Sequence, residues 1–295
     1  MIVVQLKGGL GNQLFQYAAG RMLALKHRTE LCFDTSFLAN RVPDKAKTFY
    51  NFNLGPFALP ARIATPADIP FYSGKFSTRN RLTRGVHVLQ MYSRGFRYVL
   101  QDRYEFDPRI PALPDNVYLD GYWQTDKYFL SVADQIRSDL DTDIGLSPIA
   151  RQMQQQMLAN KSVCVHIRRG DYLEILSQVG VVGADYIQAG IRLLAERHTG
   201  LHFYVFSNDP QWCVANLKIA QPHTFINAEN AGKNDKEHFM LMSSAQHFII
   251  ANSTYSWWAA WLARNQGKVV IAPKRWMLDP KINTNDVLPT GWLAL

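Results

Sequence analysis

The feature that most constrains this chain is a regular alternation of short apolar runs and helix-patterned segments after residue 145. The apolar runs are 162–167, 202–206, 224–226, 247–250 and 269–272, and the segments with helical spacing are 149–158, 185–197, 211–217, 236–243 and 255–265. Strands that alternate with helices of this length predict a doubly wound sheet of parallel strands. Ligands bind such sheets beyond the carboxyl ends of the strands, so we expect the chemistry in the loops there.

The first half of the chain has a weaker pattern. Its expected elements are a strand at 2–6, a helix at 12–26, a strand at 117–119 and a helix at 128–140. The segment 40–115 is rich in proline, arginine and aromatic residues but has little periodicity, and we expect only irregular structure and short helices there. The two halves predict an α/β fold of two domains, 1–145 and 146–295, with the end of the chain able to pack back on the first domain.

Charge and composition narrow the classes of partner. Lys and Arg total 32 against 24 acidic residues, and the net charge of +8 favours nucleic acid, a membrane surface or a phosphorylated small molecule. The charge is spread along the chain apart from an Arg-rich stretch at 79–103, so we expect no nucleic-acid partner. The cysteines, Cys32, Cys164 and Cys213, are odd in number and far apart, which argues against a disulfide framework and a CxxC zinc site.

The sequence predicts no segment that crosses a membrane. Residues 2–6 form a strand-like run without the basic region and cleavage site of a signal peptide. The longest apolar candidate, 245–263, falls short of about 18 uninterrupted apolar residues, because Asn252, Ser253 and Thr254 lie within it. We therefore expect a cytoplasmic protein whose contact with a membrane is at most peripheral.

A glycine-rich turn at 8–13 joins the first expected strand to the first expected helix. Glycine lets the backbone approach a phosphate closely, and the start of a helix attracts anions. The residues expected to contact a ligand here are Gly9, Gly11, Asn12 and Gln13. A turn needed only for packing is the alternative, and Leu14 at the third glycine position of GxGxxG argues against NAD or FAD.

The most informative loop follows the strand at 163–167, where the chain continues as RRGD at 168–171. Strand alternation directs His166 and Arg168 to the same side. Guanidinium groups suit a diphosphate, which needs bidentate donors and charge neutralisation as it departs. Asp171 places a carboxylate within reach of the same space. The alternative is that Asp171 pairs with the arginines and holds the loop.

Asn208 and Asp209 follow the strand at 202–206 and precede a helix. Either side chain can cap that helix. A carboxylate at this position can instead accept hydrogen bonds from N1 and N2 of guanine, which makes the loop a candidate contact for a base or a ribose. The sequence leaves both interpretations open.

The loop at 252–256 leads into a helix rich in tryptophan. Hydroxyl and backbone N–H groups at a helix start can bind phosphate, and simple N-capping is the alternative. The candidate contacts are Ser253, Thr254 and Ser256. We expect the tryptophans of the helix, Trp257, Trp258 and Trp261, to lie in the core rather than to form a sugar platform.

Four stretches of the chain form a set of motifs: GGLGNQLFQYAAG at 8–20, VHIRRGDY at 165–172, FYVFSND at 203–209 and ANSTYSWWAAWL at 251–262. In this order they resemble the α-1,2-fucosyltransferases of glycosyltransferase family eleven, in their bacterial form, and they span nearly the whole chain. The resemblance implies a GT-B-like fold, with two Rossmann-type domains facing a cleft, parallel sheets and the donor in the second domain. It also implies an inverting, metal-independent transfer of fucose from GDP-fucose to the 2-hydroxyl of a galactose.

The resemblance also implies roles for the candidate residues. It makes Arg168 the diphosphate ligand with His166 beside it, and it makes the 8–13 turn face the donor from the first domain. It places Asn208 or Asp209 at the guanine, and Ser253, Thr254 and Ser256 near the phosphate or ribose. The implied acceptor is a galactose-terminated oligosaccharide, free or lipid-linked, at the inner face of the bacterial inner membrane.

Such a transfer needs a base for the acceptor proton and a group that stabilises the leaving GDP. Arg168 is the expected stabiliser, and Arg169 either assists it or holds the loop. Asp171 is the first candidate for the base and Glu174 is the second. A DxD pattern at 139–143, which binds metal in some glycosyltransferases, follows a helix rather than a strand, so we expect a solvated acidic segment and no metal.

Two other interpretations are open. One is a GDP-fucose transferase that forms an α-1,6 or α-1,3 linkage, although the stretch 253–261 matches the α-1,2 group best. The other belongs to a different class: a non-catalytic glycan- or nucleotide-binding module. Such a module would keep the aromatic residues but would not need an arginine beside a carboxylate.

Overall fold

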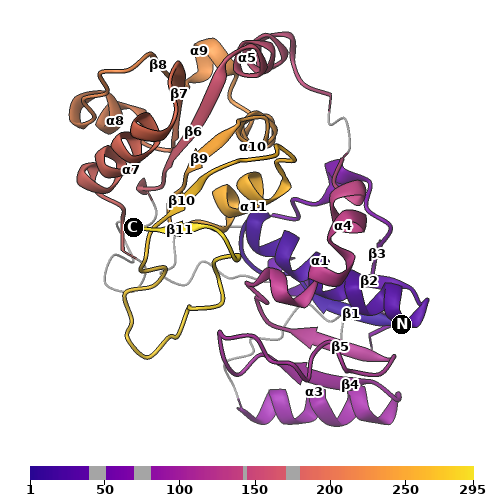
Figure 1. The fold of residues 1–295 in the computed structure, drawn as a ribbon. Helices are drawn as coiled ribbons and strands as arrows, with labels where there is room; N and C mark the ends of the chain where they lie inside the picture. Colours follow the sequence, from indigo (N-terminus) through magenta and orange to yellow (C-terminus); the bar gives the residue numbers. More distant parts are fainter. Residues whose placement is uncertain (40–50, 70–80, 142–144, 171–179) are drawn as a thin grey trace. The chain divides into compact units, whose positions relative to one another are not determined.

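The computed structural model describes residues 1–39, 51–69, 81–141, 145–170 and 180–295. The chain divides into two compact units. Unit 1 consists of Met1–Thr142 with Asn285–Val287, and unit 2 consists of Asp143–Thr284 with Leu288–Leu295. Each unit contains a sheet of parallel strands with helices packed on it (Figure 1), so the predicted α/β fold with parallel sheets is confirmed.

Unit 1 is built on a five-stranded sheet. Its strands and helices are β1 (Ile2–Gln5), α1 (Leu10–His27), β2 (Leu31–Asp34), α2 (Ser36–Ala39), β3 (Arg62–Ile63), α3 (Arg81–Ser93), β4 (Arg97–Leu100), β5 (Val117–Asp120) and α4 (Ala133–Asp139). Short 3-10 turns lie at Gly55–Phe57, Asp126–Tyr128 and Leu130–Val132. The strand order is β3-β2-β1-β5-β4, so β1 is central, between β2 and β5.

The helices α1 and α3 cover opposite faces of this sheet (Figure 1). Met91 of α3 is fully buried in a cluster with Val3 of β1 and Tyr118 of β5. Val4, the next residue along β1, faces α1. A Cβ atom at Gly20 of α1 would lie 2.4 Å from the Val4 side chain, so glycine at this position lets the helix pack directly on the strand.

Unit 1 departs from the sequence prediction in several places, among them the buried strand β2, for which no strand was expected. The segment 40–115 was expected to hold irregular structure and short helices, but it contains the 13-residue helix α3 and the strand β4. The helix α3 is as amphipathic as α5, which was predicted, so the helical pattern is present in this segment and was missed. The helix expected at 128–140 begins as 3-10 turns, and only α4 is α-helical.

A short segment near the end of the chain, Asn285–Val287, belongs to unit 1. Asp286 accepts a hydrogen bond from the backbone N–H of Phe106 at 2.9 Å and forms an ion pair with the amine of Lys127. Val287 is fully buried. These contacts tie the segment to the chain that follows β4 and β5.

Unit 2 is built on a six-stranded sheet. Its strands and helices are α5 (Pro148–Ala159), β6 (Lys161–Ile167), α7 (Ala184–Arg197), β7 (Leu201–Ser207), α8 (Pro210–Asn216), β8 (His223–Phe225), α9 (Ala228–Ala231), α10 (Asp235–Ser243), β9 (His247–Ile249), α11 (Thr254–Leu262), β10 (Val270–Ala272) and β11 (Leu293–Ala294). The strand order is β11-β10-β9-β6-β7-β8. Apart from α9 and β11, each of the strands and helices of unit 2 given above was predicted to within a few residues.

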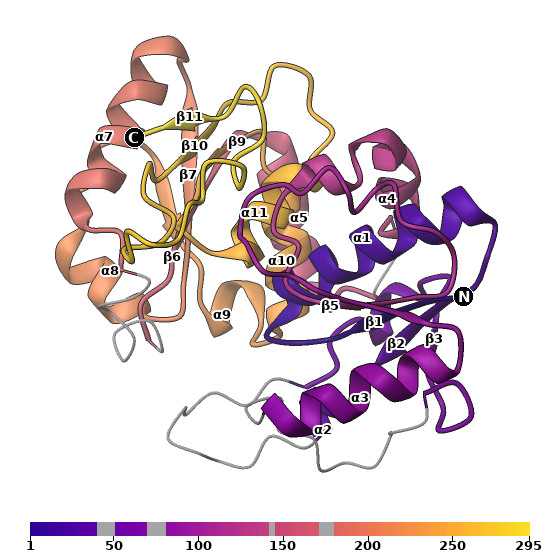
Figure 2. The same cartoon turned by 90° about the horizontal axis from the view of Figure 1, so that it is seen from below.

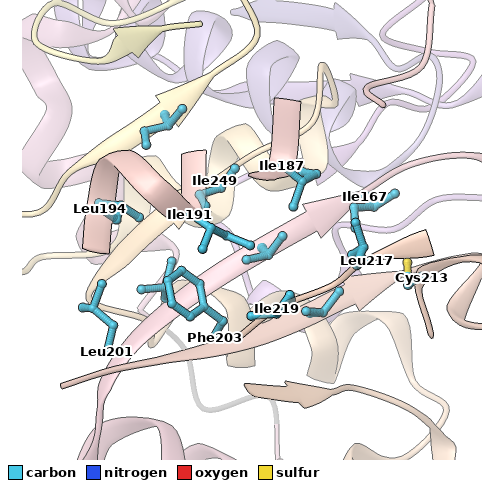
Figure 3. Packing of buried hydrophobic residues seen from close by; sticks show 14 residues of the cluster. Ile167, Ile187, Ile191, Leu194, Leu201, Phe203, Cys213, Leu217, Ile219 and Ile249 are labelled. Carbon is cyan, nitrogen blue, oxygen red and sulfur yellow. The ribbon is translucent and has the colours of Figure 1, made fainter. Parts of the chain in front are cut away.

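Aliphatic side chains between the sheet and α7 form the core of unit 2 (Figure 3). Val163, Val165 and Ile167 alternate along β6 toward this core, and Ile191 and Leu194 of α7 belong to the same cluster. The period of two along the strand and the helical spacing along α7 are the patterns that predicted both elements. The core therefore fixes β6, and with it the loop that follows β6.

The helix α11 is the most apolar helix of unit 2. Its tryptophans are buried, which confirms that Trp257, Trp258 and Trp261 belong to the core. The amine of Lys268 donates to the carbonyl oxygens of Ala260 and Ala263 at 2.7 and 2.5 Å, and these bonds cap the carboxyl end of the helix. Across the described residues of both units, no helix has the length and apolar character needed to cross a bilayer.

Each sheet has one point where the strand order reverses. In unit 2 the strands β6, β7 and β8 lie in turn to one side, and β9, β10 and β11 lie to the other. The reversal point lies between β6 and β9 in unit 2, and between β1 and β5 in unit 1. Ligands of doubly wound sheets bind beyond the carboxyl ends of the strands at this point. The loops after these four strands are therefore the places to examine for a site.

Candidate functional site

His166 lies near the carboxyl end of β6, beside the reversal point of unit 2. Burial, and then the nearby charge of Arg168, lowers its pKa from 6.5 to about 3, so the ring is neutral near pH 7. The ring centre lies 5.8 Å from that of Tyr255 in α11. Nδ1 of His166 has no hydrogen-bond partner among the described residues. An unpaired buried nitrogen costs about 1–3 kcal/mol, and such costs are concentrated at functional sites.

Arg168 follows β6 directly and is half-buried. Its charge contributes to the low pKa of His166. Burial raises the pKa of Tyr255 well above 10, and the charge of Arg168 opposes that rise. Since Tyr255 lies in the first turn of α11, which follows β9, Arg168 is near the loops after both β6 and β9. Arg168 therefore lies at the reversal point of unit 2, and a contact of its side chain with a diphosphate stays a prediction.

Arg169 is held by the neighbouring loop after β7. Its backbone N–H donates to Oδ1 of Asn208 at 2.9 Å, and its Nε donates to Asp209 at 3.3 Å. Its guanidinium carbon lies 4.0 Å from the ring centre of Trp212, which is a favourable cation–π distance. These contacts favour the interpretation that Arg169 holds the loop, while a role in assisting the chemistry stays a prediction.

Asn208 and Asp209 both have partners within unit 2. Asp209 caps α8, because it accepts a hydrogen bond from the backbone N–H of Trp212 at 3.2 Å. Gly170 passes so close to Asn208 that an added Cβ atom would lie 2.3 Å from Nδ2 of the amide. The loops after β6 and β7 are thus joined tightly. A contact of either side chain with guanine stays a prediction.

The start of α11 lacks a side-chain cap. Ser253 occupies the N-cap position, but within the described part of the chain its hydroxyl accepts no hydrogen bond from the first turn. The N–H groups of such a helix end can bind an anion. Ser256 is fully buried and donates to the carbonyl oxygen of Ser253 at 3.2 Å, whereas Thr254 is half-buried. Ser253 and Thr254 therefore border the reversal point, and Ser256 lies in the interior of unit 2.

The glycine-rich turn of unit 1 is shorter than predicted, because α1 begins at Leu10. Gly9 is its N-cap residue, and Gly11 is buried in the first helical turn. Gln13 is fully buried, and its amide nitrogen donates to the carbonyl oxygen of Gly8 at 2.8 Å. Gly11 and Gln13 are therefore buried within unit 1. A contact of this turn with a ligand stays a prediction.

Several polar groups near the reversal point of unit 1 are paired with one another, although the indole N–H of Trp123 has no partner among the described residues. The pairs that join the chain after β1 to β5 and the turn after it are Asn12 with Gln124 at 2.8 Å, Gln16 with the carbonyl oxygen of Gly121 at 3.1 Å, and the ion pair of Lys7 with Asp120. Asp120 is buried and also accepts a hydrogen bond from the hydroxyl of Tyr98. Asn12, predicted to contact a ligand, is therefore engaged with Gln124.

Sequence reasoning missed three parts of these two edges: Trp212, Tyr255 and the turn at 121–124. Within that turn Trp123 adopts a left-handed backbone with φ of 56°, which is rare for a bulky residue. The turn follows the strand expected at 117–119, so the strand-end rule was sufficient to find it. Trp212 gave no such signal, since its approach to the loop after β6 depends on tertiary packing. Tyr255 lies in the loop at 252–256, which the same rule singled out, but it was given no role there.

The two candidate bases, Asp171 and Glu174, lie outside the described residues. In the described ranges no group of three or more His, Cys, Asp or Glu side chains could hold a metal ion. Asp139 of the DxD pattern was expected to be solvated, but it accepts hydrogen bonds from the hydroxyl of Tyr17 at 2.5 Å and from Nε of Arg21 at 2.9 Å. Its carboxylate is needed there because it ties α4 to α1.

The edge of unit 2 brings together a guanidinium group, a neutral imidazole and an uncapped helix start. The guanidinium and the helix end both attract negative charge, and both present N–H donors. Such an arrangement suits an anion with several oxygen atoms, of which a diphosphate is the expected example. The chemistry that it supports is stabilisation of a phosphate leaving group.

Comparisons with known proteins identify what the chain is similar to. The family model described as Glycosyl transferase family 11 matches residues 62–295. An alpha-1,2-colitosyltransferase of Escherichia coli is 29% identical over 307 residues, with 100% of this chain and 99% of that protein covered. The galactoside alpha-(1,2)-fucosyltransferase 1 of Leontocebus fuscicollis is 28% identical over 155 residues, with 49% of this chain and 42% of that protein covered.

Among solved structures, the fucosyltransferase NodZ from Bradyrhizobium aligns with 88% of this chain and 91% of its own, at 11% identity and a TM-score of 0.46. A likeness this distant carries no argument about activity.

Proposed function

The chain belongs to glycosyl transferase family 11, and from this premise we propose that it transfers L-fucose from GDP-fucose to the 2-hydroxyl of a terminal galactose. That it is a glycosyltransferase follows from the family; the donor, the acceptor and the linkage are proposed. The observation that carries the proposal is the edge of unit 2, where Arg168, His166 and the uncapped start of α11 lie together.

The names of two relatives support the linkage and the acceptor. One relative is named for an alpha-1,2-colitosyl transfer and the other for an alpha-(1,2)-fucosyl transfer to a galactoside. Both names specify the same linkage, and the second also specifies galactose. The acceptor that we propose is a galactose-terminated oligosaccharide, free or carried on a lipid.

In the proposed reaction the acceptor hydroxyl displaces GDP in a single step, with inversion at the anomeric carbon. Arg168 donates to the diphosphate as negative charge develops on the leaving oxygen, and the N–H groups at the start of α11 add to this stabilisation. The guanidinium takes the place of a divalent metal, so the proposed reaction is metal-independent. Asp171 is the proposed base that accepts the hydroxyl proton, with Glu174 as the second candidate.

His166 has a different part in this proposal. With a pKa of about 3, its ring carries no charge near pH 7 and cannot neutralise the diphosphate. It therefore acts as a hydrogen-bonding group that fills the space beside Arg168. The packing of its ring near Tyr255 fixes the orientation of the imidazole between β6 and α11.

A second donor is favoured by one observation: a relative that aligns over 100% of this chain is named a colitosyltransferase. Colitose is fucose without its 3-hydroxyl group. A donor site that hydrogen-bonds this hydroxyl rejects the deoxy sugar by about 10⁴–10⁵, whereas an apolar site discriminates by only about 10² or less. GDP-colitose is therefore the second candidate donor.

The test is a turnover assay with lactose and each of the two donors, in the presence of EDTA. We expect GDP to be released from GDP-fucose and a fucosyl group to appear on the 2-hydroxyl of galactose, as determined by NMR of the product. Another linkage, or a strict need for Mn²⁺, would contradict that part of the proposal. If only GDP-colitose were turned over, the proposed donor would be GDP-colitose and not GDP-fucose. GDP binding without turnover of either donor would indicate a binding module.

A further inference from the structure

The net charge of the chain is concentrated in one stretch of unit 1. Between residues 69 and 101 the sequence contains no acidic residue and six basic ones: Lys75, Arg79, Arg81, Arg84, Arg94 and Arg97. These six charges are three quarters of the net charge of +8, although the stretch is a small part of the chain. The helix α3 and the strand β4 lie within it, and α3 begins at Arg81.

The helix α3 also presents a row of large apolar side chains to solvent. The exposed fractions are 49% for Val86, 70% for Leu89 and 71% for Tyr92. A spacing of three residues puts these side chains on one side of the helix. Single exposed apolar residues are common on protein surfaces, but a contiguous row of them marks an interaction surface.

This row is not needed for the core of unit 1. On its other side α3 is anchored by Met91, which is fully buried, and the chain after the helix is anchored by Phe96, which is 9% exposed. Figure 2 shows α3 along the outside of unit 1. The outer face of α3, defined by Val86, Leu89 and Tyr92, is therefore not covered by the described residues of unit 1.

We propose that α3 is an interfacial helix whose outer face lies on an anionic lipid surface. The three apolar side chains of the outer face enter the boundary between headgroups and acyl chains, and Arg94 and Arg97 supply the attraction to lipid phosphates. Arg94 and Arg97, both exposed, flank the carboxyl end of α3. This inference does not rest on the proposed function.

Charge alone would also fit a nucleic acid or a second copy of the chain. A nucleic acid would pair with the arginines but would leave Leu89 and Tyr92 in water, so it explains only half of the surface. In a symmetric pair of chains the two basic stretches would face one another, and like charges would oppose the contact. An anionic bilayer accommodates the charges and the apolar row together.

Sedimentation with lipid vesicles tests the proposal on the full chain. We expect the protein to bind vesicles made of equal parts phosphatidylglycerol and phosphatidylcholine, to bind pure phosphatidylcholine much less, and to be released by high salt. The double variant Leu89→Ser with Tyr92→Ser should bind the mixed vesicles at least about tenfold more weakly, since two large apolar contacts are lost. Arg94→Glu with Arg97→Glu should weaken binding by a comparable factor.

Matched variants in unit 2 provide the controls. Leu158 and Val214 are 61% and 62% exposed, so Leu158→Ser with Val214→Ser removes a similar apolar surface elsewhere. Lys218→Glu with Lys233→Glu makes the same charge change on exposed residues of unit 2. Both control variants should bind the mixed vesicles as the unchanged protein does. Circular dichroism and melting temperature should confirm that each variant is folded.

Several results would overturn the proposal. One is a lack of binding to the mixed vesicles, and another is an equal loss in the unit 2 controls. Binding of single-stranded RNA that is lost in Arg94→Glu with Arg97→Glu, while vesicle binding is unchanged, would make the partner a nucleic acid. A mass of two chains by light scattering that falls to one in Leu89→Ser with Tyr92→Ser would make the partner a second copy.

Discussion

The carboxyl edges of the two sheets have the same topology but different side-chain chemistry. At the reversal point of unit 1 the charged side chains Lys7 and Asp120 form an ion pair, although the indole N–H of Trp123 has no partner among the described residues. At the reversal point of unit 2, Nδ1 of His166 has no partner among the described residues, and the start of α11 has no side-chain cap. Topology therefore determines where a site can form, and the pairing of side chains determines whether a ligand can use it.

The largest effect on the free energy of unfolding is expected from removing the ion pair at the carboxyl edge of the unit 1 sheet. Asp120→Asn keeps the shape of the side chain but leaves the amine of Lys7, largely buried, without its counter-charge. Removing one partner of a buried ion pair costs about 3–5 kcal/mol. The free energy of urea unfolding, together with hydrogen exchange of the β1 amides, measures this loss.

The matched control is an exposed pair in the same unit. Arg103 and Asp102 lie 3.4 Å apart, and both are more than half exposed. Asp102→Asn should therefore change the free energy of unfolding by less than about 1 kcal/mol. Equal losses in the two variants would show that the edge of unit 1 is not held by its paired groups.

The next effect is a change in activity when the arginines at the carboxyl edge of the unit 2 sheet are substituted. If Arg168 stabilises the departing diphosphate, Arg168→Lys should raise the barrier by about 2–4 kcal/mol, because a point charge cannot replace a planar fork. Arg169 is already engaged with Asp209 and Trp212, so Arg169→Lys should cost about 1 kcal/mol or less. The values of kcat/KM with GDP-fucose measure both effects. Full activity of Arg168→Lys would remove this residue from its proposed role.

The smallest effect is a pH dependence of stability. His166 binds a proton near pH 6.5 in the unfolded chain but only near pH 3 in the fold. The free energy of unfolding is therefore highest above pH 6.5 and falls as the pH drops toward 3, with a slope that rises to about 1.4 kcal/mol per pH unit. Urea unfolding at pH 6.5 and pH 5.5 should show a loss of about 1 kcal/mol in the unchanged protein and a smaller loss in His166→Gln. Identical slopes would contradict the buried, neutral imidazole.

The elements of unit 2 were predictable because local signals and packing agree there. Ser147 and Asp209 cap α5 and α8, and a proline follows each of them at the first helical position. In unit 1, β3 has only two residues, which is too short for a periodic pattern. The edge strand β4 is half-exposed or exposed throughout, so it lacks the apolar alternation by which strands are recognised.

The position of the candidate site could be predicted from the sequence better than the residues that form it. Arg168 could be placed because it follows a buried strand, and parallel strands end at one edge. Gln13 and Asp209 have side chains suited to a ligand, but the structure engages both in bonds within their own units. A sequence shows which residue types are present, whereas their partners are decided by chain segments far away in the sequence.

The return of Asn285–Val287 to unit 1 gives the chain an order of assembly. The ribosome releases residues 1–142 first, yet Asp286, which accepts the N–H of Phe106 and pairs with Lys127, is made only after nearly all of unit 2. Domains generally fold as they emerge. Here the earlier unit stays incomplete until the later one is almost synthesised. The last step in the folding of unit 1 therefore waits for the synthesis of unit 2.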